Sequence, residues 1–190
     1  DAVASAGIAP PTQKAIFAFG TTGGSSRINT SNLVSSSGVV ASNTSGVGTA
    51  RTNPAGVSYG LDKGIFAFGQ DSSGKTNVKN LVNNSGVIAS DATGVGTARQ
   101  ATRGAAYGGD KAVFAFGTDS SADVAISNKV SNSGVVATDT SAVSGTSARN
   151  NPGAVGYGGD KGIFAFGGGP LMNTRNLVSN QGVVAADATG

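Results

Sequence analysis

An apolar phrase, Ile-Phe-Ala-Phe-Gly, occurs at residues 16–20, 65–69 and 163–167, and Val113 replaces its isoleucine in a fourth copy at residues 113–117. The copies lie about 48 residues apart, so four units account for nearly all of the 190 residues. All eight phenylalanines lie in these phrases, two in each. Repeats of this length are supersecondary units that bury their apolar faces only against neighbouring copies. The pattern therefore predicts one repeat domain whose core is shared equally among the units.

Each unit offers four short strands separated by glycine, asparagine, serine and aspartate, which supply turns. The phrase itself is apolar on both sides of the pleat. Alternation places Phe66 and Phe68 on one side and Ile65 and Ala67 on the other, as expected for a sheet wedged between two neighbours. In the second unit, the predicted strands are residues 57–60, 63–69, 80–82 and 86–91.

No window shows the sustained i, i+3, i+4 apolar spacing of an amphipathic helix. The first strand of each unit is made mostly of small residues, as at 104–108, which suits a strand crowded near a central axis. We therefore predict an all-β fold, a β-propeller of four four-stranded blades. An open repeat array or an eight-bladed dimer are the alternatives. The units run approximately over residues 1–50, 51–98, 99–148 and 149–190.

The two ends of the chain fall at adjacent points of the repeat. Gly190 corresponds to Gly94, and Asp1 corresponds to about Ala50. This is the phase expected when four whole units close into a ring.

The composition removes most reactive groups. The chain has no cysteine, histidine, tryptophan or glutamate, so disulfides and thiolate metal sites are excluded and the usual general bases are missing. The net charge of +3 comes from scattered residues, which is too mild for a nucleic-acid footprint. No apolar stretch approaches ~18 residues, so no transmembrane helix is expected. We expect no enzyme activity, no cofactor and no metal site.

The order Thr-Ala-Arg, small residues, Tyr-Gly-Gly-Asp-Lys and Ile-Phe-Ala-Phe-Gly resembles a kelch repeat, whose second strand likewise ends in glycine. It also resembles a kelch-like repeat in structural proteins of tailed bacteriophages, notably marine and cyanobacterial phages. The likeness is strongest over residues 107–117, 157–167 and 176–185 and covers essentially the whole chain. Departures are the lack of tryptophan and of a double glycine outside Gly168. The resemblance implies kelch-like blades and a place in a virion, with an extracellular location as the alternative.

Arginines, tyrosines and Asp-Lys pairs recur at fixed places in the repeat, the arginines 15 residues before the first phenylalanine of their unit. The charged groups could form a ring that binds an anion, but strict repetition favours hydrogen bonding between blades. The tyrosines could form a sugar-stacking platform, but packing at a blade edge is favoured. The structural repeat positions are Phe17, Phe19, Phe66, Phe68, Phe114, Phe116, Phe164, Phe166, Arg51, Arg99, Arg149, Tyr59, Tyr107 and Tyr157.

The segment between the second and third strands varies most among the units. From the glycine that ends strand two to the asparagine that starts strand three, the spacing is 12, 11, 11 and 9 residues. Repeat proteins place such variation on one face, often the binding face, although neutral surface loops are an equal interpretation. Asp119 and Asp123 lack the spacing of an EF-hand loop, so a cation site is disfavoured. The segments are residues 21–31, 70–79, 118–127 and 168–175, and the candidate partner-binding residues are Arg27, Lys75, Lys79, Asp119, Asp123 and Arg175.

These observations favour a non-enzymatic structural or interaction module, a virion component that decorates the particle or serves in host adhesion. Its partners would be other virion proteins or a host-surface glycan, contacted through the blade loops. Weak sites repeated over several copies gain avidity from effective concentration. A soluble multivalent lectin with one sugar pocket per blade gap is the alternative function, and a homo-oligomer is left open.

Overall fold

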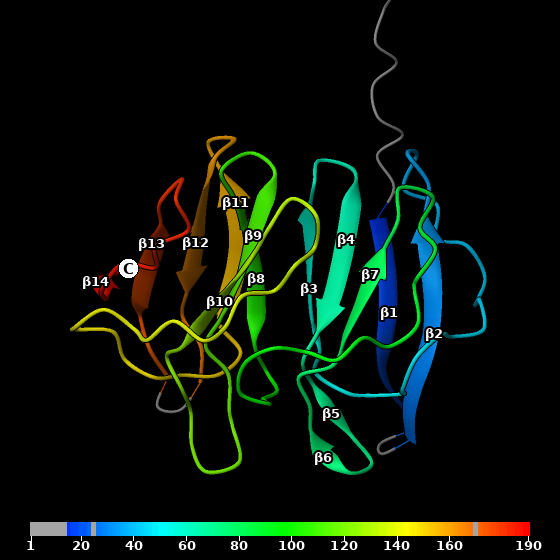
Figure 1. Cartoon of the computed structure of the whole chain (residues 1–190), viewed down its shortest axis with the longest axis horizontal. Helices are drawn as coiled ribbons and strands as arrows, with labels where there is room; N and C mark the ends of the chain where they lie inside the picture. The colour runs from blue at the N-terminus through cyan, green and yellow to red at the C-terminus, as the bar shows by residue number, and fades with distance from the viewer. Residues whose placement is uncertain (1–14, 24–25, 169–170) are drawn as a thin grey trace, which may run out of the picture.

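The computed structural model describes residues 15–23, 26–168 and 171–190, which form strands, turns and loops (Figure 1). No helix occurs in these ranges, so the predicted all-β class is confirmed, and the same ranges hold no helix that could span a membrane. The start of the first unit, residues 1–14, lies outside them. The strands are β1 (Ala15–Thr22), β2 (Ser26–Val34), β3 (Ala55–Tyr59), β4 (Lys63–Ala67), β5 (Gln70–Asp71), β6 (Gly74–Lys75), β7 (Lys79–Val82), β8 (Arg103–Tyr107), β9 (Lys111–Ala115), β10 (Ser127–Val130), β11 (Gly153–Tyr157), β12 (Lys161–Ala165), β13 (Thr174–Val178) and β14 (Ala188–Thr189).

Each unit forms its own antiparallel sheet, numbered here in chain order. The first sheet is β1–β2, the second β3–β4–β7, the third β8–β9–β10 and the fourth β11–β12–β13–β14. Within the last three, consecutive strands pair side by side, for example β3 with β4 and β4 with β7. The small hairpin β5–β6 was not expected, and it lies within the variable segment of the second unit.

The fourth predicted strand is not continuous. In the second unit, β7 pairs with this segment only through the isolated bridges Val82↔Ile88 and Lys79↔Ala92. Between them, the side-chain amide of Asn80 donates to the carbonyl of Ala89 at 3.0 Å. The prediction of an uninterrupted strand over 86–91 was wrong, because a side chain takes over part of the backbone pairing.

The core lies between successive sheets, as the repeat predicted. One buried cluster joins residues of the second and third sheets, and another joins the third and fourth. The first strands pack closely, β3 against β8 and β8 against β11. Small residues permit this approach, since a Cβ added at Gly104 would lie 2.7 Å from the Cβ of Val57.

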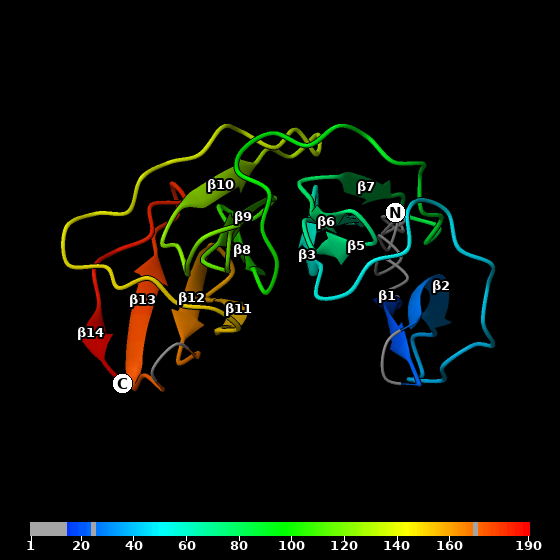
Figure 2. The same ribbon diagram turned by 90° about the horizontal axis from the view of Figure 1, so that it is seen from below.

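The four sheets form an arch (Figure 2). β1 and β2 lie at one end, and β11 to β14 lie at the other. β3, β8 and β11 face the concave side, in the position that the innermost strands of propeller blades take. Closure of the sheets into a ring stays a prediction.

The second phenylalanine of each phrase turns the backbone out of the strand. Phe68 has a φ of 63° and Gly69 has a φ of 108°, so β4 ends at Ala67. The same left-handed φ occurs at Phe19 (65°), Phe116 (64°) and Phe166 (61°).

This turn sends the two phenylalanines of one phrase toward opposite neighbours. Phe66 packs edge-on against Phe19 of the first sheet, whereas Phe68 packs edge-on against Phe114 of the third, each pair with ring centroids 5.5 Å apart. The prediction that Phe66 and Phe68 face the same way was wrong, because alternation of sides holds only while the backbone stays extended.

The connections between strands gather on two edges of the arch (Figure 1). The turns at residues 60–62 and 83–86 lie at the upper edge, here called the hairpin edge. The variable segments 70–79 and 118–127 extend to the lower edge, here called the loop edge. Sequence variation among the units is therefore displayed along one rim of the molecule.

Candidate functional site

The three repeated arginines lie between successive sheets and are completely buried. The guanidinium of Arg99 lies 4.0 Å from the ring centroid of Phe68 in the preceding sheet. Its Nη2 donates to Asn128 at 2.6 Å and its Nε to the carbonyl of Phe116 at 3.0 Å. The amide of Gly69 donates to the Arg99 carbonyl at 2.9 Å. The Phe-Gly turn therefore contacts the side chain of Arg99 through Phe68 and its backbone through Gly69. The same stacking distance of 4.0 Å is found for Arg51 on Phe19 and for Arg149 on Phe116.

A polar chain continues from each arginine into its own sheet. Asn128 donates to the carbonyl of Ala137 at 3.0 Å and to Asp139 at 2.8 Å. Asp139 also accepts from the backbone amide and the hydroxyl of Thr97, at 2.9 and 2.7 Å, and lies 3.8 Å from Arg99. Since Thr97 belongs to the preceding unit, the carboxylate ties two units together.

The electrostatics of this chain follow from burial and pairing. Burial lowers the pKa of Arg51 and Arg99 to about 10, and the nearby aspartates offset part of that effect. Burial alone would raise the pKa of Asp139, but hydrogen bonds from Thr97 and Asn128 and the charge of Arg99 outweigh it and hold the pKa below its ordinary value. Both groups therefore remain charged at neutral pH and form an ion pair shared by two sheets.

The first unit departs from this pattern in two coupled positions. Asn43 stands where the other units have aspartate, and the spacing of the repeat puts Ala2 where they have arginine. Asn32 still donates to Asn43 at 2.8 Å. A neutral amide avoids leaving a carboxylate without its cation. The paired replacement is visible in the sequence, and the sequence interpretation missed it.

The exposure of the three repeated tyrosines depends on their place in the arch. Tyr59 and Tyr107 are buried, whereas Tyr157 of the last sheet is 41% exposed. Two of the three rings are therefore closed to a sugar. The Asp-Lys pairs lie on the hairpin edge and are joined internally, at 2.8 Å for Asp62–Lys63, 2.7 Å for Asp110–Lys111 and 2.6 Å for Asp160–Lys161.

The charged side chains of Arg27, Lys75 and Asp123 each contact a neighbouring unit. Arg27 donates to the carbonyl of Gln70 at 3.0 Å, and Lys75 donates to the carbonyl of Asp119. Asp123 accepts from Asn150 at 3.0 Å. The charged groups thus hold the loops of neighbouring units together along the loop edge.

Four of the six candidates lie within strands, namely Arg27 in β2, Lys75 in β6, Lys79 in β7 and Arg175 in β13. Lys79 belongs to β7 and donates to the carbonyl of Gly134 at 3.3 Å. Arg175 belongs to β13 and donates to the carbonyl of Thr189. The assignment of these four residues to loops was wrong, because strands extend into the variable segments.

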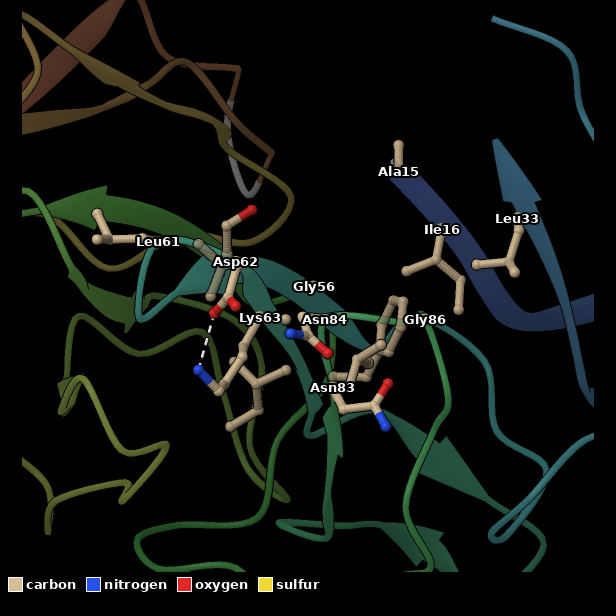
Figure 3. Close-up of a pocket in the computed structure, with 16 residues that line it drawn as sticks. Ala15, Ile16, Leu33, Gly56, Leu61, Asp62, Lys63, Asn83, Asn84 and Gly86 are labelled. Atoms are coloured by element: carbon tan, nitrogen blue, oxygen red, sulfur yellow. Dashed lines mark hydrogen bonds and ion pairs between the residues drawn. The ribbon is translucent and has the colours of Figure 1, made fainter. Parts of the chain in front are cut away.

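A cavity of about 530 Å³ lies between the first and second sheets (Figure 3). Ile16 and Leu33 line its side on the first sheet, and Phe66 lines the side on the second. Asp62 and Lys63 form their ion pair at its margin. In the gaps between the later sheets, the first strands of neighbouring sheets pack against each other, β3 against β8 and β8 against β11.

The predicted first strand of the first unit falls within residues 1–14, outside the described residues. A second cavity, between the third and fourth sheets, measures about 60 Å³.

No cluster of three or more histidine, cysteine, aspartate or glutamate side chains suited to a metal ion is found within residues 15–23, 26–168 and 171–190. Neither a family model nor a curated protein matches the chain. The function must therefore be inferred from the fold and its side chains.

Proposed function

We propose that this chain is a non-enzymatic structural and interaction module, an array of kelch-like blades that presents its loop edge to a partner. The proposal rests on where the repeated and the varying residues lie in the fold. The repeated arginine, asparagine, aspartate and phenylalanine residues are used between sheets. The segments that vary in length and sequence among the units reach the loop edge. The tips in the second and third units both read Asp-Ser-Ser and expose Ser72, Ser73, Ser120 and Ser121.

The chemistry of the chain supports a role without catalysis. Its lysine-aspartate pairs are neutralised locally, and its repeated arginines are buried between sheets. Within the described residues, the charged side chains that line the cavity between the first two sheets, Asp62 and Lys63, pair with each other at 2.8 Å. A rigid scaffold with variable loops is instead the usual arrangement for binding.

The proposed setting is a bacteriophage particle, where the module decorates the virion or serves in host adhesion. The resemblance of its repeat to kelch-like phage structural proteins is the basis of this part of the proposal. The hydroxyl-rich loop tips can hydrogen-bond to either another virion protein or a surface glycan.

Recovery with particles tests the proposal. Tagged protein added to particles lacking it should migrate with them through a density gradient at a fixed stoichiometry. A Ser72→Glu, Ser121→Glu double variant on the loop edge should lose this association. The matched control on the hairpin edge, Ser85→Glu with Ser133→Glu, should keep it, and both should melt at the wild-type temperature.

Equal binding by the two double variants would show that the loop edge is not the contact surface. Failure of the wild-type chain to associate would remove the virion role. Saturable binding on a glycan array, with thermal stabilisation by the same sugar, would favour the lectin alternative.

A further inference from the structure

The three internal contacts between sheets define one interface with two unlike halves. Each sheet has a forward face, which carries the second phenylalanine of its phrase, and a rear face, which carries the first. The ring of the forward face always packs edge-on against that of the next rear face. The centroid distances are 5.5 Å for Phe19–Phe66, 5.5 Å for Phe68–Phe114 and 5.4 Å for Phe116–Phe164.

One copy of each half is left exposed at the ends of the arch. Phe17 on the rear face of the first sheet is 65% exposed, whereas its counterparts Phe114 and Phe164 are completely buried. Phe166 on the forward face of the fourth sheet is 59% exposed, although its counterpart Phe116 is also completely buried. The exposed neighbours on these faces are Val40 on the first sheet and Val155, Tyr157 and Leu177 on the fourth.

We propose that these two faces bind each other between two copies of this chain, head to tail, in a closed ring of eight sheets. The internal interface, repeated three times, shows which surface each face accepts. In one arch, the two end faces lie at opposite ends of the molecule (Figure 2). A second arch that faces the first brings both pairs of ends together. Two head-to-tail contacts close the dimer into a ring, so the assembly does not grow into a filament. Once the first contact has formed, the second is intramolecular and is favoured by the high effective concentration of the two faces.

The charges at the ends fit this contact. At the internal interfaces, the rear-face unit brings an arginine that stacks on the partner phenylalanine and pairs with an aspartate, as Arg99 does. The first unit has Asn43 in place of the aspartate, and the repeat spacing gives it alanine rather than arginine at the other position. Its sequence therefore lacks both charges of the pair. The contact between copies buries apolar groups without leaving an unpaired ion, and it is weaker than the three internal contacts because it lacks the arginine stack.

A cysteine pair tests which ends meet. The chain contains no cysteine, so a Val40→Cys, Leu177→Cys double variant offers only these two thiols and keeps Phe17 and Phe166 in the contact. A flexible bismaleimide should give a covalent species of twice the 18.3 kDa chain mass on a denaturing gel. A cross-link at the mass of one chain, a ladder of larger polymers, or no cross-link would each overturn the closed dimer.

Sedimentation of chains without cysteine provides the second test. The wild type should sediment as a dimer, and Phe166→Asp or Phe17→Asp should weaken dimerisation by about 1,000-fold, since each change removes a central aromatic anchor from both contacts. The control Val135→Asp, at an exposed valine of the third unit, should remain dimeric.

Mixing the two aspartate variants should restore association, because one intact Phe166 face then meets one intact Phe17 face. A monomeric wild type would overturn the proposal. So would a mixture that stays monomeric, or loss of the dimer in the control as well.

Discussion

A phenylalanine in a conformation that this residue rarely adopts sits at the centre of each contact between sheets. The φ of 63° at Phe68 costs about 1–2 kcal/mol for a side chain with a Cβ. The turn aims the ring at Arg99 and the following amide of Gly69 at the Arg99 carbonyl. Glycine is required next, because a Cβ at position 69 would lie 2.8 Å from the carbonyl oxygen of Thr52. The same φ of 61° at Phe166, which is 59% exposed, shows that the turn forms within each unit, and the contacts with the ring and the amide are added where a next sheet is present.

Leu61 adopts a left-handed conformation without such compensation. It has a φ of 71° in the hairpin turn and is 81% exposed, while the corresponding residues Gly109 and Gly159 are glycines. Leu61→Gly should raise the free energy of unfolding by roughly 0.5–1 kcal/mol, because glycine adopts this φ freely. Chemical denaturation measures the change. The reverse control, Gly109→Leu, should lower stability, and an unchanged or lower stability of the Leu61 variant would contradict the explanation.

Neighbouring sheets are joined by both an aromatic contact and an ion pair between a buried arginine and a partly exposed aspartate. The aromatic pair provides apolar area, and the ion pair with its asparagine fixes the relative position of the sheets through directional hydrogen bonds. Each sheet therefore depends on its neighbour for a complete polar network, which suits stability that arises from nearest-neighbour contacts.

Removing the arginine should expose the strength of this link. Arg99→Met should lower the free energy of unfolding by about 1–3 kcal/mol, since it leaves the buried side-chain oxygen of Asn128 without its donor and removes the cation near Asp139. Lys129→Met is a control, because Lys129 makes only an exposed hydrogen bond to Gln181 and should change stability by less than about 1 kcal/mol. Urea denaturation at pH 7 compares the two, and equal losses would contradict a special role for the buried arginine.

The same link predicts how stability depends on pH. The pKa values of Asp91, Asp139 and Asp187 lie below their ordinary range in the folded protein, so folding favours the ionised carboxylates. Their contribution is fully present above the unfolded pKa and is lost as the pH falls through the folded values. Stability should therefore hold between about pH 7 and 5 and decline below about pH 4.

The variant Asp139→Asn should be less stable at pH 7 and should lose less on acidification, as followed by thermal melting across this range. Asn43 in the first unit shows that the repeat accommodates an amide at this position. A decline that is already complete by pH 5, or a variant with the wild-type pH profile, would refute the assignment.

In the whole molecule, a sheet with both faces packed against neighbours should unfold locally less often than a sheet with one exposed face. The third sheet is covered on both faces, and Val113 and Phe114 in β9 are completely buried. The first and fourth sheets each leave one apolar face exposed. Amides of β9 should exchange slowest, and those of β1 and β12 faster, because local opening is easiest where few contacts are lost.

Hydrogen exchange read by mass spectrometry at low and high protein concentration checks this order. If the ends associate as proposed, protection of β1 and β12 should increase with concentration while that of β9 stays constant. Uniform exchange in all four sheets would mean that the array unfolds as one unit.

The sequence by itself determined the all-β class, the four units and the shared core, because these depend on periodicity and turn residues that are local properties of the chain. It also placed Arg51, Arg99 and Arg149 at equivalent positions, since equal spacing in a repeat gives equal surroundings. Even the neutral pair of the first unit, Ala2 and Asn43, was readable from the aligned units.

Only the tertiary structure decided where the side chains point. The opposite directions of Phe66 and Phe68 follow from a positive φ at the end of the strand, and strand periodicity contains no information about it. The interruption of the fourth strand depends on the Asn80 amide, whose partners come together only after folding. The exposed faces of Phe17 and Phe166 likewise emerge from how far the arch extends. Identical phrases in the sequence thus acquire different surroundings, because burial is a property of neighbours in space.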